Sequence, residues 1–391
     1  MSRLYLPAMA VASCLGMGKD ATMGPLLAGS RRGLRHVDGF PVPLGALPEE
    51  IPPLPAALGR WECRNNRLLA VLAAEVADEI AQAIRRFGAH RIAVVIGTST
   101  SGIAEGEAAF ARHARTGEWP EGFDYRQQET GSGALFLADL LGLSGPAYVV
   151  ATACSSGAKA LASARRLIRA GLADAAIVGG ADTLCRLTVT GFGALEALSP
   201  GPCNPFSANR AGITIGEGGG LFLLSPDPAK IELAGLGETS DAHHVSAPDP
   251  EGAGALAAMG AALADAGLSP AGIGYVNLHG TGTALNDSME AKAVAALFPQ
   301  GVPCSSTKAM TGHTLGAAGA VEAAFLWLML SLRWNPDGRL PPHLWDGVAD
   351  PLLPRLDLAG EGHRLSRPAA LSNSFAFGGS NCCLAFRRGM P

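Results

Sequence analysis

Charged and aromatic residues are scarce in this sequence, at 16% and 6% of its 391 positions. The net charge is only −4 and no run of Lys or Arg occurs, which argues against a nucleic-acid-binding function. The eight cysteines show neither a CxxC pair nor a Cys/His zinc spacing. They therefore fit a reducing cytosol better than a disulfide scaffold or a structural metal site.

Long apolar runs are also missing. The most apolar helix candidate, residues 319–334, is too short to cross a bilayer and carries Glu322 near its start. The N-terminal apolar stretch, residues 3–13, precedes a Gly turn and is predicted to be the first strand rather than a signal peptide. We therefore expect a cytoplasmic protein without a membrane span.

Hydrophobic residues, at 48%, and 51 glycines supply a large core with many tight turns. Several apolar runs end in Gly-, Ser- or Thr-rich turns and lead into helix-like segments, a pattern typical of buried, mostly parallel sheets in an α/β fold. Strands are predicted to begin near residues 91, 146, 174, 273, 302 and 369. Helices are predicted over 65–88, 156–171, 254–267 and 287–298.

The two halves of the chain echo one another. Three strand-and-turn elements in the first half resemble three in the second half and occur in the same order, which favours duplication. Pro226 and Pro228 lie between the two halves and are typical of a connecting segment. We therefore predict an N-terminal half, residues 1–225, and a C-terminal half, residues 226–391.

A cysteine stands at a predicted strand-to-helix junction in "ATACSSGAKA", residues 151–160. A helix N-terminus favours an anion, so we expect the pKa of Cys154 to be lowered and its thiolate to act as a nucleophile. The alternative is a buried cysteine that acts only as a small hydrophobe, and the residue alone does not decide between them.

A second candidate lies in "NLHGTGTALNDSMEAKA", where His279 follows an apolar strand. The carboxyl ends of strands in α/β sheets are where sites form, and Thr281 and Thr283 offer hydroxyls on the same loop. Asp287 is predicted to cap the next helix, with Glu290 completing a capping-box pattern. Taken alone, His279 is better explained as a structural loop histidine.

Lys308 and His313 share the loop of "SSTKAMTGHTLGAAG", and "SNSFAFGGSN" supplies a Gly-rich turn near the C-terminus. A lysine near an apolar core needs a partner, for which Glu290 is a candidate. In the second segment, Gly378 and Gly379 free the backbone to approach a ligand, so that an N–H can serve an oxyanion. The alternatives are a surface lysine beside a structural histidine, and two core phenylalanines, Phe375 and Phe377.

Together these motifs resemble the β-ketoacyl-acyl-carrier-protein synthases of the thiolase-like superfamily, over nearly the whole chain and most densely from residue 96 to 386. "ATACSSGA" resembles the nucleophile turn of these condensing enzymes, "HGTGT" the first histidine motif and "KAMTGHTLGAAG" the Lys/His motif. "NSFAFGGSN" resembles the C-terminal Gly-rich turn, and residues 204–220 resemble a further signature. The resemblance implies two duplicated halves in a five-layered αβαβα sandwich.

The resemblance also implies a chemistry. The Cys-His-His set is similar to that of elongating synthases, in which Cys154 would hold the acyl chain as a thioester. His279 and His313 would stabilise the enolate formed when malonyl-carrier loses CO2. Backbone N–H groups of Cys154 and Phe377 would bind the oxyanion. No metal or bound cofactor is expected, since the substrates arrive on the phosphopantetheine arm of an acyl carrier protein.

Other roles follow from the same resemblance. Lys308 would organise the site through Glu290, Thr281 and Thr283 would bind pantetheine, and Phe377 would gate malonyl access while Phe375 packs. The sequence departs from the family at Ala376, where Gly is usual, and at Ser380, where Thr is usual. The product would be a fatty-acid, aryl polyene or other polyketide chain longer by two carbons.

Two alternative functions remain open from the sequence. The first is a catalytically silent, chain-length-factor-like partner that binds a carrier protein or another synthase, and the second is a Cys-His hydrolase. The intact Cys154, His279, His313 and Lys308 argue against the silent partner, whereas two histidines and a lysine are more than a hydrolase requires. A thiolase is disfavoured because "FAFGGSN" occupies the place of its second cysteine.

An acidic carrier protein needs a basic landing site. Arg60, Arg64 and Arg67 in "GRWECRNNRLL" have helical i,i+3 and i,i+4 spacing and are predicted to share one face. A solvated helix face is the alternative. The resemblance further implies a dimer across the N-terminal-half sheet, either a homodimer or a heterodimer with a ketosynthase-like paralogue.

Overall fold

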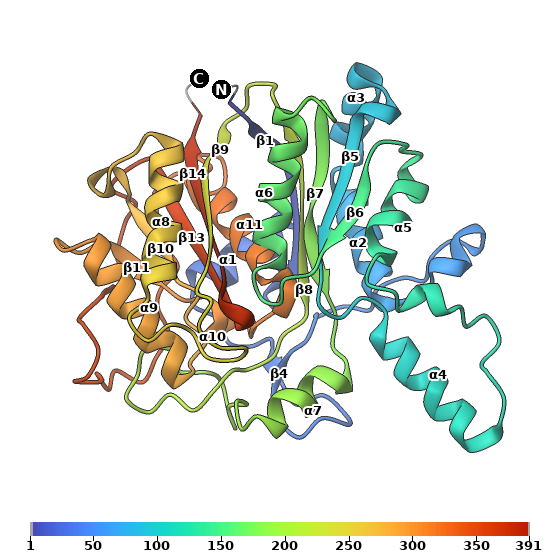
Figure 1. The fold of residues 1–391 in the computed structure, drawn as a ribbon, viewed down its shortest axis with the longest axis horizontal. Coiled ribbons are helices and arrows are strands. Elements are labelled where there is room, and N and C mark those ends of the chain that lie inside the picture. Colours follow the sequence, from blue (N-terminus) through green and yellow to red (C-terminus); the bar gives the residue numbers. More distant parts are fainter. Residues whose placement is uncertain (1–2, 390–391) are drawn as a thin grey trace.

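The computed structural model describes residues 3–389. Two groups of five strands repeat one topology (Figure 1). In the first half, the strands are β1 (Tyr5–Ser13), β5 (Ile92–Gly97), β6 (Ala147–Val150), β7 (Ala175–Asp182) and β8 (Gly218–Ser225). In the second half, they are β9 (Ile231–Ser240), β10 (Tyr275–Asn277), β11 (Pro303–Ser305), β13 (Ala369–Ala376) and β14 (Ser380–Arg388).

The strand order is β6-β5-β7-β8-β1 in one half and β11-β10-β13-β14-β9 in the other, so corresponding strands occupy corresponding places. The first three strands of each list run parallel and the last two are antiparallel to their neighbours. The halves meet where Tyr5 of β1 pairs with Glu232 of β9. The predicted division after residue 225 falls in the turn between β8 and β9.

The five strands of each half form one sheet layer, called here the first and the second sheet, and two helices lie between these layers. α6 (Ser156–Arg169) packs on β5 and β7, α11 (Ala318–Leu330) packs on β8 and β13, and the two helices contact each other (Figure 1). The outer face of the first sheet carries α2 (Arg64–Glu75) and α5 (Ser132–Leu141), and that of the second carries α8 (Ala253–Ala266) with α9 (Ala284–Leu297) beside it. This arrangement is the five-layered αβαβα sandwich.

Small residues bring the two central helices close together. A Cβ on Gly157 of α6 would lie 2.7 Å from the backbone nitrogen of Ala320. A Cβ on Gly319 of α11 would lie 2.7 Å from that of Ala158. Because these helices carry the segments that follow Cys154 and His313, the crossing fixes the two motifs relative to each other.

The remaining elements are short or peripheral. The helices are α1 (Lys19–Leu27), α3 (Ala77–Phe87), α4 (Ile103–Thr116), α7 (Arg186–Ala194) and α10 (Lys308–Thr311). The strands are β2 (Gly16–Met17), β3 (Leu34–Arg35), β4 (Leu44–Gly45) and β12 (Asp357–Leu358). The 3-10 turns are η1 (Ala56–Trp61), η2 (Ala89–Arg91), η3 (Tyr125–Gln127), η4 (Pro270–Gly272), η5 (Leu315–Ala317) and η6 (Phe377–Gly379).

Two predictions about local structure need correction. The single helix predicted over 65–88 is divided at Val76, whose φ of −122° is not helical, so that α3 turns Ile80 and Ala83 toward the core. The helix predicted from residue 287 begins at Ala284, with Thr283 as its N-cap, so Asp287 lies inside the helix and is not the cap. Across residues 3–389, no helix is long and apolar enough to span a membrane.

Candidate active site

Cys154 lies in the sharp turn between β6 and α6. Ala153 has a φ of +51°, a left-handed conformation that is costly for a residue with a side chain. The hydroxyl of Ser156 donates to the Ala153 carbonyl at 2.6 Å and accepts from the Thr152 amide at 2.9 Å, which holds this turn. The turn therefore presents the Cys154 thiol, 8% exposed, to a cavity of about 430 Å³.

The predicted lowering of the Cys154 pKa is wrong for the resting site. Burial raises the pKa of this thiol to about 12, and the nearby charge of Lys308 opposes that shift only in part. The N-terminus of α6 does not outweigh the loss of water around the sulfur. Cys154 is therefore a neutral thiol at pH 7, so a nucleophilic role would require the loss of its proton.

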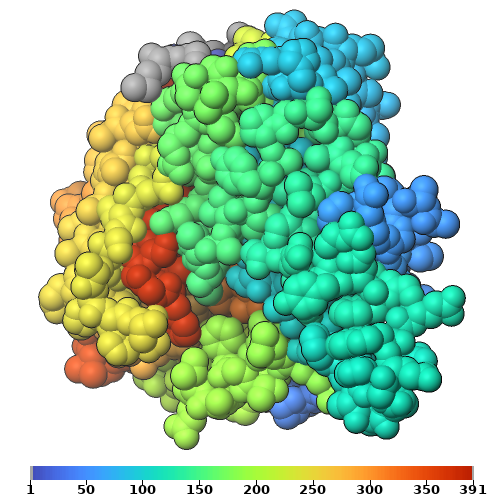
Figure 2. All heavy atoms as spheres, turned by 45° about the vertical axis from the view of Figure 1, so that its right-hand side comes forward, coloured from blue at the N-terminus to red at the C-terminus, as the bar shows by residue number. Residues whose placement is uncertain are grey.

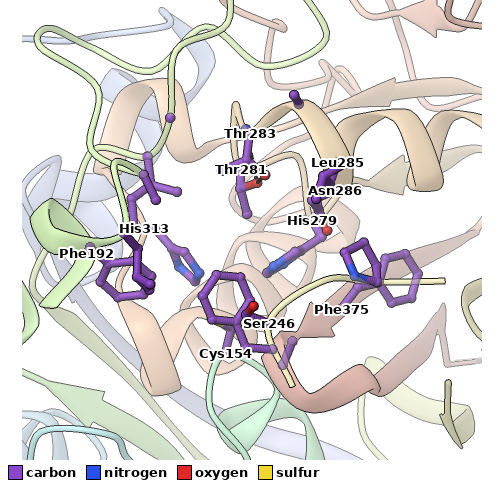
Figure 3. Close-up of a pocket in the computed structure, with 18 of the residues that line it drawn as sticks. Cys154, Phe192, Ser246, His279, Thr281, Thr283, Leu285, Asn286, His313 and Phe375 are labelled. Atoms are coloured by element: carbon purple, nitrogen blue, oxygen red, sulfur yellow. Dashed lines mark hydrogen bonds between the residues drawn. The ribbon is translucent and has the colours of Figure 1, made fainter. Parts of the chain in front are cut away.

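The two histidines reach the same place from the C-terminal half. His279 follows β10 and His313 follows α10, and their rings lie 5.3 Å apart at 86° to each other. The Cys154 sulfur and one nitrogen of each ring lie within 4.8 Å of one another. Figure 3 shows both rings directed toward the space above Cys154. Burial and the charge of Lys308 hold the pKa of both histidines well below 6.5, so both imidazoles are neutral.

Lys308 is buried behind His279. Its Nζ donates to the His279 carbonyl at 2.6 Å and to Oε1 of Glu322 at 2.5 Å, and lies 3.4 Å from His279 Nδ1. An ammonium has only protons to offer, so Nδ1 acts as the acceptor. The hydrogen of His279 is thereby placed on Nε2, which gives the cavity a hydrogen-bond donor.

The predicted Lys308–Glu290 pair is therefore wrong. Glu290 accepts from the amides of His279 and Gly280, each at 2.7 Å, and from the side-chain amide of Asn373 at 3.0 Å. Burial raises the pKa of Glu290 to about 7, against these hydrogen bonds. Glu290 shapes the His279 loop, and the partner of Lys308 is Glu322.

Asp287 has a similar structural task. Its carboxylate accepts from the Phe206 amide at 2.8 Å and from the Gly282 amide at 3.2 Å. It thus joins α9 to the loop before it and to the segment around residue 206. The capping-box pattern placed Asp287 and Glu290 near the correct loop, but with the wrong contacts.

The walls of the cavity contain other predicted residues. Thr281 and Thr283 line it, with their hydroxyls 3.0 Å apart, and Phe375 is buried 6.3 Å from the His279 ring (Figure 3). Phe377 is 39% exposed and lies 5.8 Å from Phe192 of α7. In Figure 2 the red segment near the C-terminal end reaches the surface between the yellow segment and the light-green α7.

The Gly-rich turn differs from its prediction in one respect. The Gly378 amide donates to the Val245 carbonyl at 2.9 Å, so this N–H is already used, and Gly378 does not line the cavity. Ala376 has ordinary extended backbone, φ −105°, so the usual Gly is not required there. Ser380 lies 3.2 Å, oxygen to oxygen, from Ser155 and so links this turn to the one that carries Cys154.

The three arginines do not form the predicted patch. Arg60 belongs to η1, whereas Arg64 and Arg67 belong to α2, so the three share no helical face. Each is paired with a carboxylate: Arg60 with Asp139 at 2.6 Å, Arg64 with the buried Glu217 at 2.7 Å, and Arg67 with Glu62. Their charges are therefore largely neutralised within the chain.

Sequence reasoning missed two supporting residues besides Glu322. His343 Nδ1 accepts from the Ser306 amide at 3.1 Å, and its Nε2 lies 3.0 Å from the Pro205 carbonyl. The Ser306 hydroxyl donates to the Gly280 carbonyl at 2.7 Å and accepts from the Lys308 amide at 3.3 Å. This chain of contacts holds the His279 loop in register with the Lys308 loop.

The sequence points to only one of these three residues, Glu322. Glu322 stands alone in an otherwise apolar segment, and a buried carboxylate requires a partner, so its pairing was detectable in principle. His343 and Ser306 lie in segments with no recognisable pattern. Burial lowers the pKa of His343 to about 4, which keeps it neutral and fixes its role as a hydrogen-bonding spacer.

Comparison with known proteins agrees with this site. The family described as "Beta-ketoacyl synthase, N-terminal domain" matches residues 65–229, and "Beta-ketoacyl synthase, C-terminal domain" matches residues 231–340. The chain is 37% identical over 265 residues to 3-oxoacyl-[acyl-carrier-protein] synthase 2 of Staphylococcus aureus, a match spanning 63% of each chain. It is 33% identical to Nodulation protein E of Rhizobium meliloti over 95% of this chain and 96% of that one.

Solved structures give the same answer. A chain from the complex of the ketosynthase ApeO with its chain length factor ApeC, from Xenorhabdus doucetiae, is 44% identical with a TM-score of 0.95, covering 99% of this chain and 98% of that one. A beta-ketoacyl synthase from Burkholderia phymatum is 29% identical with a TM-score of 0.87, covering 99% and 100%. From its fold, its site and these matches, the chain belongs to the beta-ketoacyl synthase family.

Proposed function

We propose that this protein is a β-ketoacyl-acyl-carrier-protein synthase that elongates an acyl chain by decarboxylative Claisen condensation. The observation that carries the proposal is the meeting of one thiol and two neutral imidazoles at the base of one cavity. A nucleophile alone would serve many acyl transfers. Two hydrogen-bond donors facing it suit a reaction in which a second thioester must become an enolate.

In the first half-reaction, Cys154 attacks the thioester carbonyl of an acyl-carrier protein. The new bond is Cys154 Sγ to acyl carbon, and the broken bond is that between the acyl carbon and the carrier sulfur. The thiol proton ends on the departing carrier thiolate, so no net proton is consumed. Backbone N–H groups of Cys154 and Phe377 stabilise the tetrahedral oxyanion.

In the second half-reaction, malonyl-carrier enters and loses CO2. The Nε2–H groups of His279 and His313 donate to its thioester oxygen and stabilise the enolate left behind. The enolate carbon then attacks the acyl-Cys154 carbonyl, and Cys154 leaves as a thiolate that takes one proton from the medium. Lys308 keeps His279 in the required tautomer, with Glu322 as its counter-ion.

The mouth of the cavity supports this order of events. Thr281 and Thr283 lie where a phosphopantetheine arm would pass and would hydrogen-bond its amides. The partly exposed Phe377, against Phe192, would open for the malonyl group. Phe375 keeps the His279 side of the cavity packed. We propose that no bound cofactor or metal takes part.

The partners we propose are an acyl carrier protein and a second ketosynthase-like chain, identical or paralogous. Two similar solved structures pair a ketosynthase with a chain length factor, including one at 44% identity. β6 lies at the end of the strand order, and all four of its residues are only half-buried. A partner laid along that edge would complete their burial. Light scattering that finds only a monomer in the purified protein would favour the paralogue.

Intact-mass spectrometry tests the function directly. Acyl-carrier proteins of increasing chain length are added first, and malonyl-carrier protein second. The proposal expects an acyl adduct on Cys154 that is then released as a β-ketoacyl-carrier two carbons longer. Condensation by a Cys154→Ala protein would refute it.

The competing function is a catalytically silent partner subunit. A similar solved structure, at 44% identity, is that of a ketosynthase in complex with its chain length factor, which supports this second candidate. A folded protein that forms no adduct with any acyl carrier, alone or with a paralogue, would favour it. Release of free acid without CO2 would indicate a hydrolase instead.

A further inference from the structure

Three buried side chains at the base of the cavity bring atoms of metal-ligating types close together. Cys154, His279 and His313 bring one sulfur and two nitrogens to within 4.8 Å of one another, and all three side chains are buried. We propose that these three residues bind a zinc ion, and that zinc is a reversible inhibitor which competes with the acyl substrate for Cys154.

The donors are available for a metal. Among residues 3–389, neither ring nitrogen of His313 has a hydrogen-bond partner, although His313 is only 2% exposed. His279 directs Nδ1 toward Lys308, so Nε2 lies on the cavity side and must give up its hydrogen before it can bind the ion. In Figure 3 the two histidine rings approach the space above Cys154 from separate segments.

The donor set suits zinc. One thiolate and two imidazoles are common zinc ligands, with Zn–S near 2.3 Å and Zn–N near 2.0 Å, so that tetrahedral donors lie about 3.3–3.5 Å apart. From a separation of at most 4.8 Å, each side chain needs to move inward by roughly 1 Å. The perpendicular rings, at 86°, already approach from different directions.

The surroundings permit a fourth ligand. Three protein ligands with one open position is the arrangement of zinc sites that exchange water or substrate, in contrast to closed structural sites. Here the open side is the cavity of about 430 Å³, through which the ion and a water molecule can enter. The nearest cation, Lys308, is paired with Glu322 at 2.5 Å, so this pair adds no net positive charge against the ion.

Binding exchanges two protons for one ion. The zinc–sulfur bond forms as the Cys154 S–H bond breaks, and the zinc–nitrogen bond at His279 forms as its Nε2–H bond breaks. Nδ1 of His279 takes a proton from the Lys308 ammonium, and the two displaced protons go to the buffer. The sulfur is then a weaker nucleophile toward a thioester, because it shares electron density with the ion, and both imidazoles are withdrawn from the substrate oxygen. Metal binding itself does not depend on the proposed condensation, although its inhibitory effect does.

Cobalt(II) is the probe for binding, because zinc is spectroscopically silent. The full-length protein is titrated with cobalt and then with zinc. We expect a thiolate-to-cobalt charge-transfer band that saturates at one ion per chain and disappears as zinc displaces cobalt. The band should be absent in Cys154→Ser, and His313→Asn should weaken binding at least tenfold. Circular dichroism confirms that each variant is folded.

Alkylation gives a second readout that needs no turnover. Zinc should slow iodoacetamide labelling of Cys154, and a chelator should restore it. The control is His363→Asn, which removes a surface histidine 3.5 Å from Asp357 and should change neither result. The binding site is refuted if folded protein gives no charge-transfer band, or if the band survives in the His279→Asn/His313→Asn double variant. A bound ion that leaves labelling of Cys154 unchanged would overturn the inhibition.

Discussion

The Lys308–Glu322 pair offers the sharpest test of the site's architecture. Both side chains are almost wholly buried, at 1% and 4% exposure, and their charged atoms lie 2.5 Å apart. Glu322→Gln leaves a buried ammonium without its counter-ion. Removing one member of a buried pair costs roughly 3–5 kcal/mol of unfolding free energy, and we expect a loss in this range.

A double-mutant cycle isolates the pair. Lys308→Met should cost a similar amount, because Glu322 is then the uncompensated charge. The double variant Lys308→Met/Glu322→Gln removes both charges and should recover roughly 2–3 kcal/mol relative to the sum of the single variants. The assay is urea unfolding followed by circular dichroism and tryptophan fluorescence, with coincident transitions required before free energies are compared.

Glu290 supplies the matched control. It is also buried, but it binds the amides of His279 and Gly280 rather than Lys308. Lys308→Met combined with Glu290→Leu should therefore give additive losses. The reasoning fails if Lys308 couples to Glu290 instead, or if Glu322→Gln unfolds within 1 kcal/mol of the unaltered protein.

Three further predictions follow from the same geometry. Alkylation of Cys154 by iodoacetamide, read by peptide mass spectrometry, should accelerate about tenfold per pH unit from pH 7 to 10, because its raised pKa of about 12 keeps the thiolate fraction small throughout. His313→Asn should keep Cys154 acylation but slow CO2 release by roughly 10²–10³-fold, because one donor to the enolate is lost. His343→Leu should lower the unfolding free energy by roughly 1–3 kcal/mol, because the Ser306 amide and the Pro205 carbonyl lose their partner. In a kinetic assay this variant should lower kcat more than it changes KM, since it displaces the His279 loop without touching substrate.

Each of these predictions has a contrary outcome. A labelling rate that levels off between pH 6 and 8 would show that the helix N-terminus does stabilise the Cys154 thiolate. Loss of acylation in His313→Asn would make His313 the essential proton acceptor of the first half-reaction. Full activity and stability in His343→Leu, with His343→Gln indistinguishable from it, would remove His343 from the positioning network.

The residues that we propose to carry the chemistry could be found in the sequence because each lies in a contiguous motif. Cys154, His279 and Lys308 follow the strands β6, β10 and β11, and parallel strands end at the same edge of a sheet. The order of repeated elements also predicted the duplicated topology. These inferences depend only on local pattern and on strand direction, both of which a sequence records.

Contacts between segments far apart in the chain were harder to predict from the sequence. Glu290 lies on a recognised motif, and so it was assigned to Lys308, whereas Glu322 on α11 is the acid that reaches it. Arg64 appeared to be a surface residue until its bidentate contact with Glu217, 153 positions away, placed it against the core. Pairing over such separations depends on the packing of whole layers.

The error over the Cys154 pKa has a different cause. A helix N-terminus can be recognised from sequence, but the loss of solvent around a side chain cannot be. Here burial is the larger effect and its sign is opposite. A motif thus predicts which group reacts more reliably than it predicts the group's protonation state.

The crossing of α6 and α11 has a consequence for how this site can evolve. Gly157 and Gly319 let backbone meet backbone, and backbone atoms have no rotamers with which to absorb an added methyl group. A substitution at either glycine would push the nucleophile's half of the molecule away from the half that holds the two histidines. The distance of Cys154 from His279 and His313 therefore depends on main-chain packing between α6 and α11. Residues that line the cavity walls can therefore change while the spacing of Cys154, His279 and His313 at its base is kept.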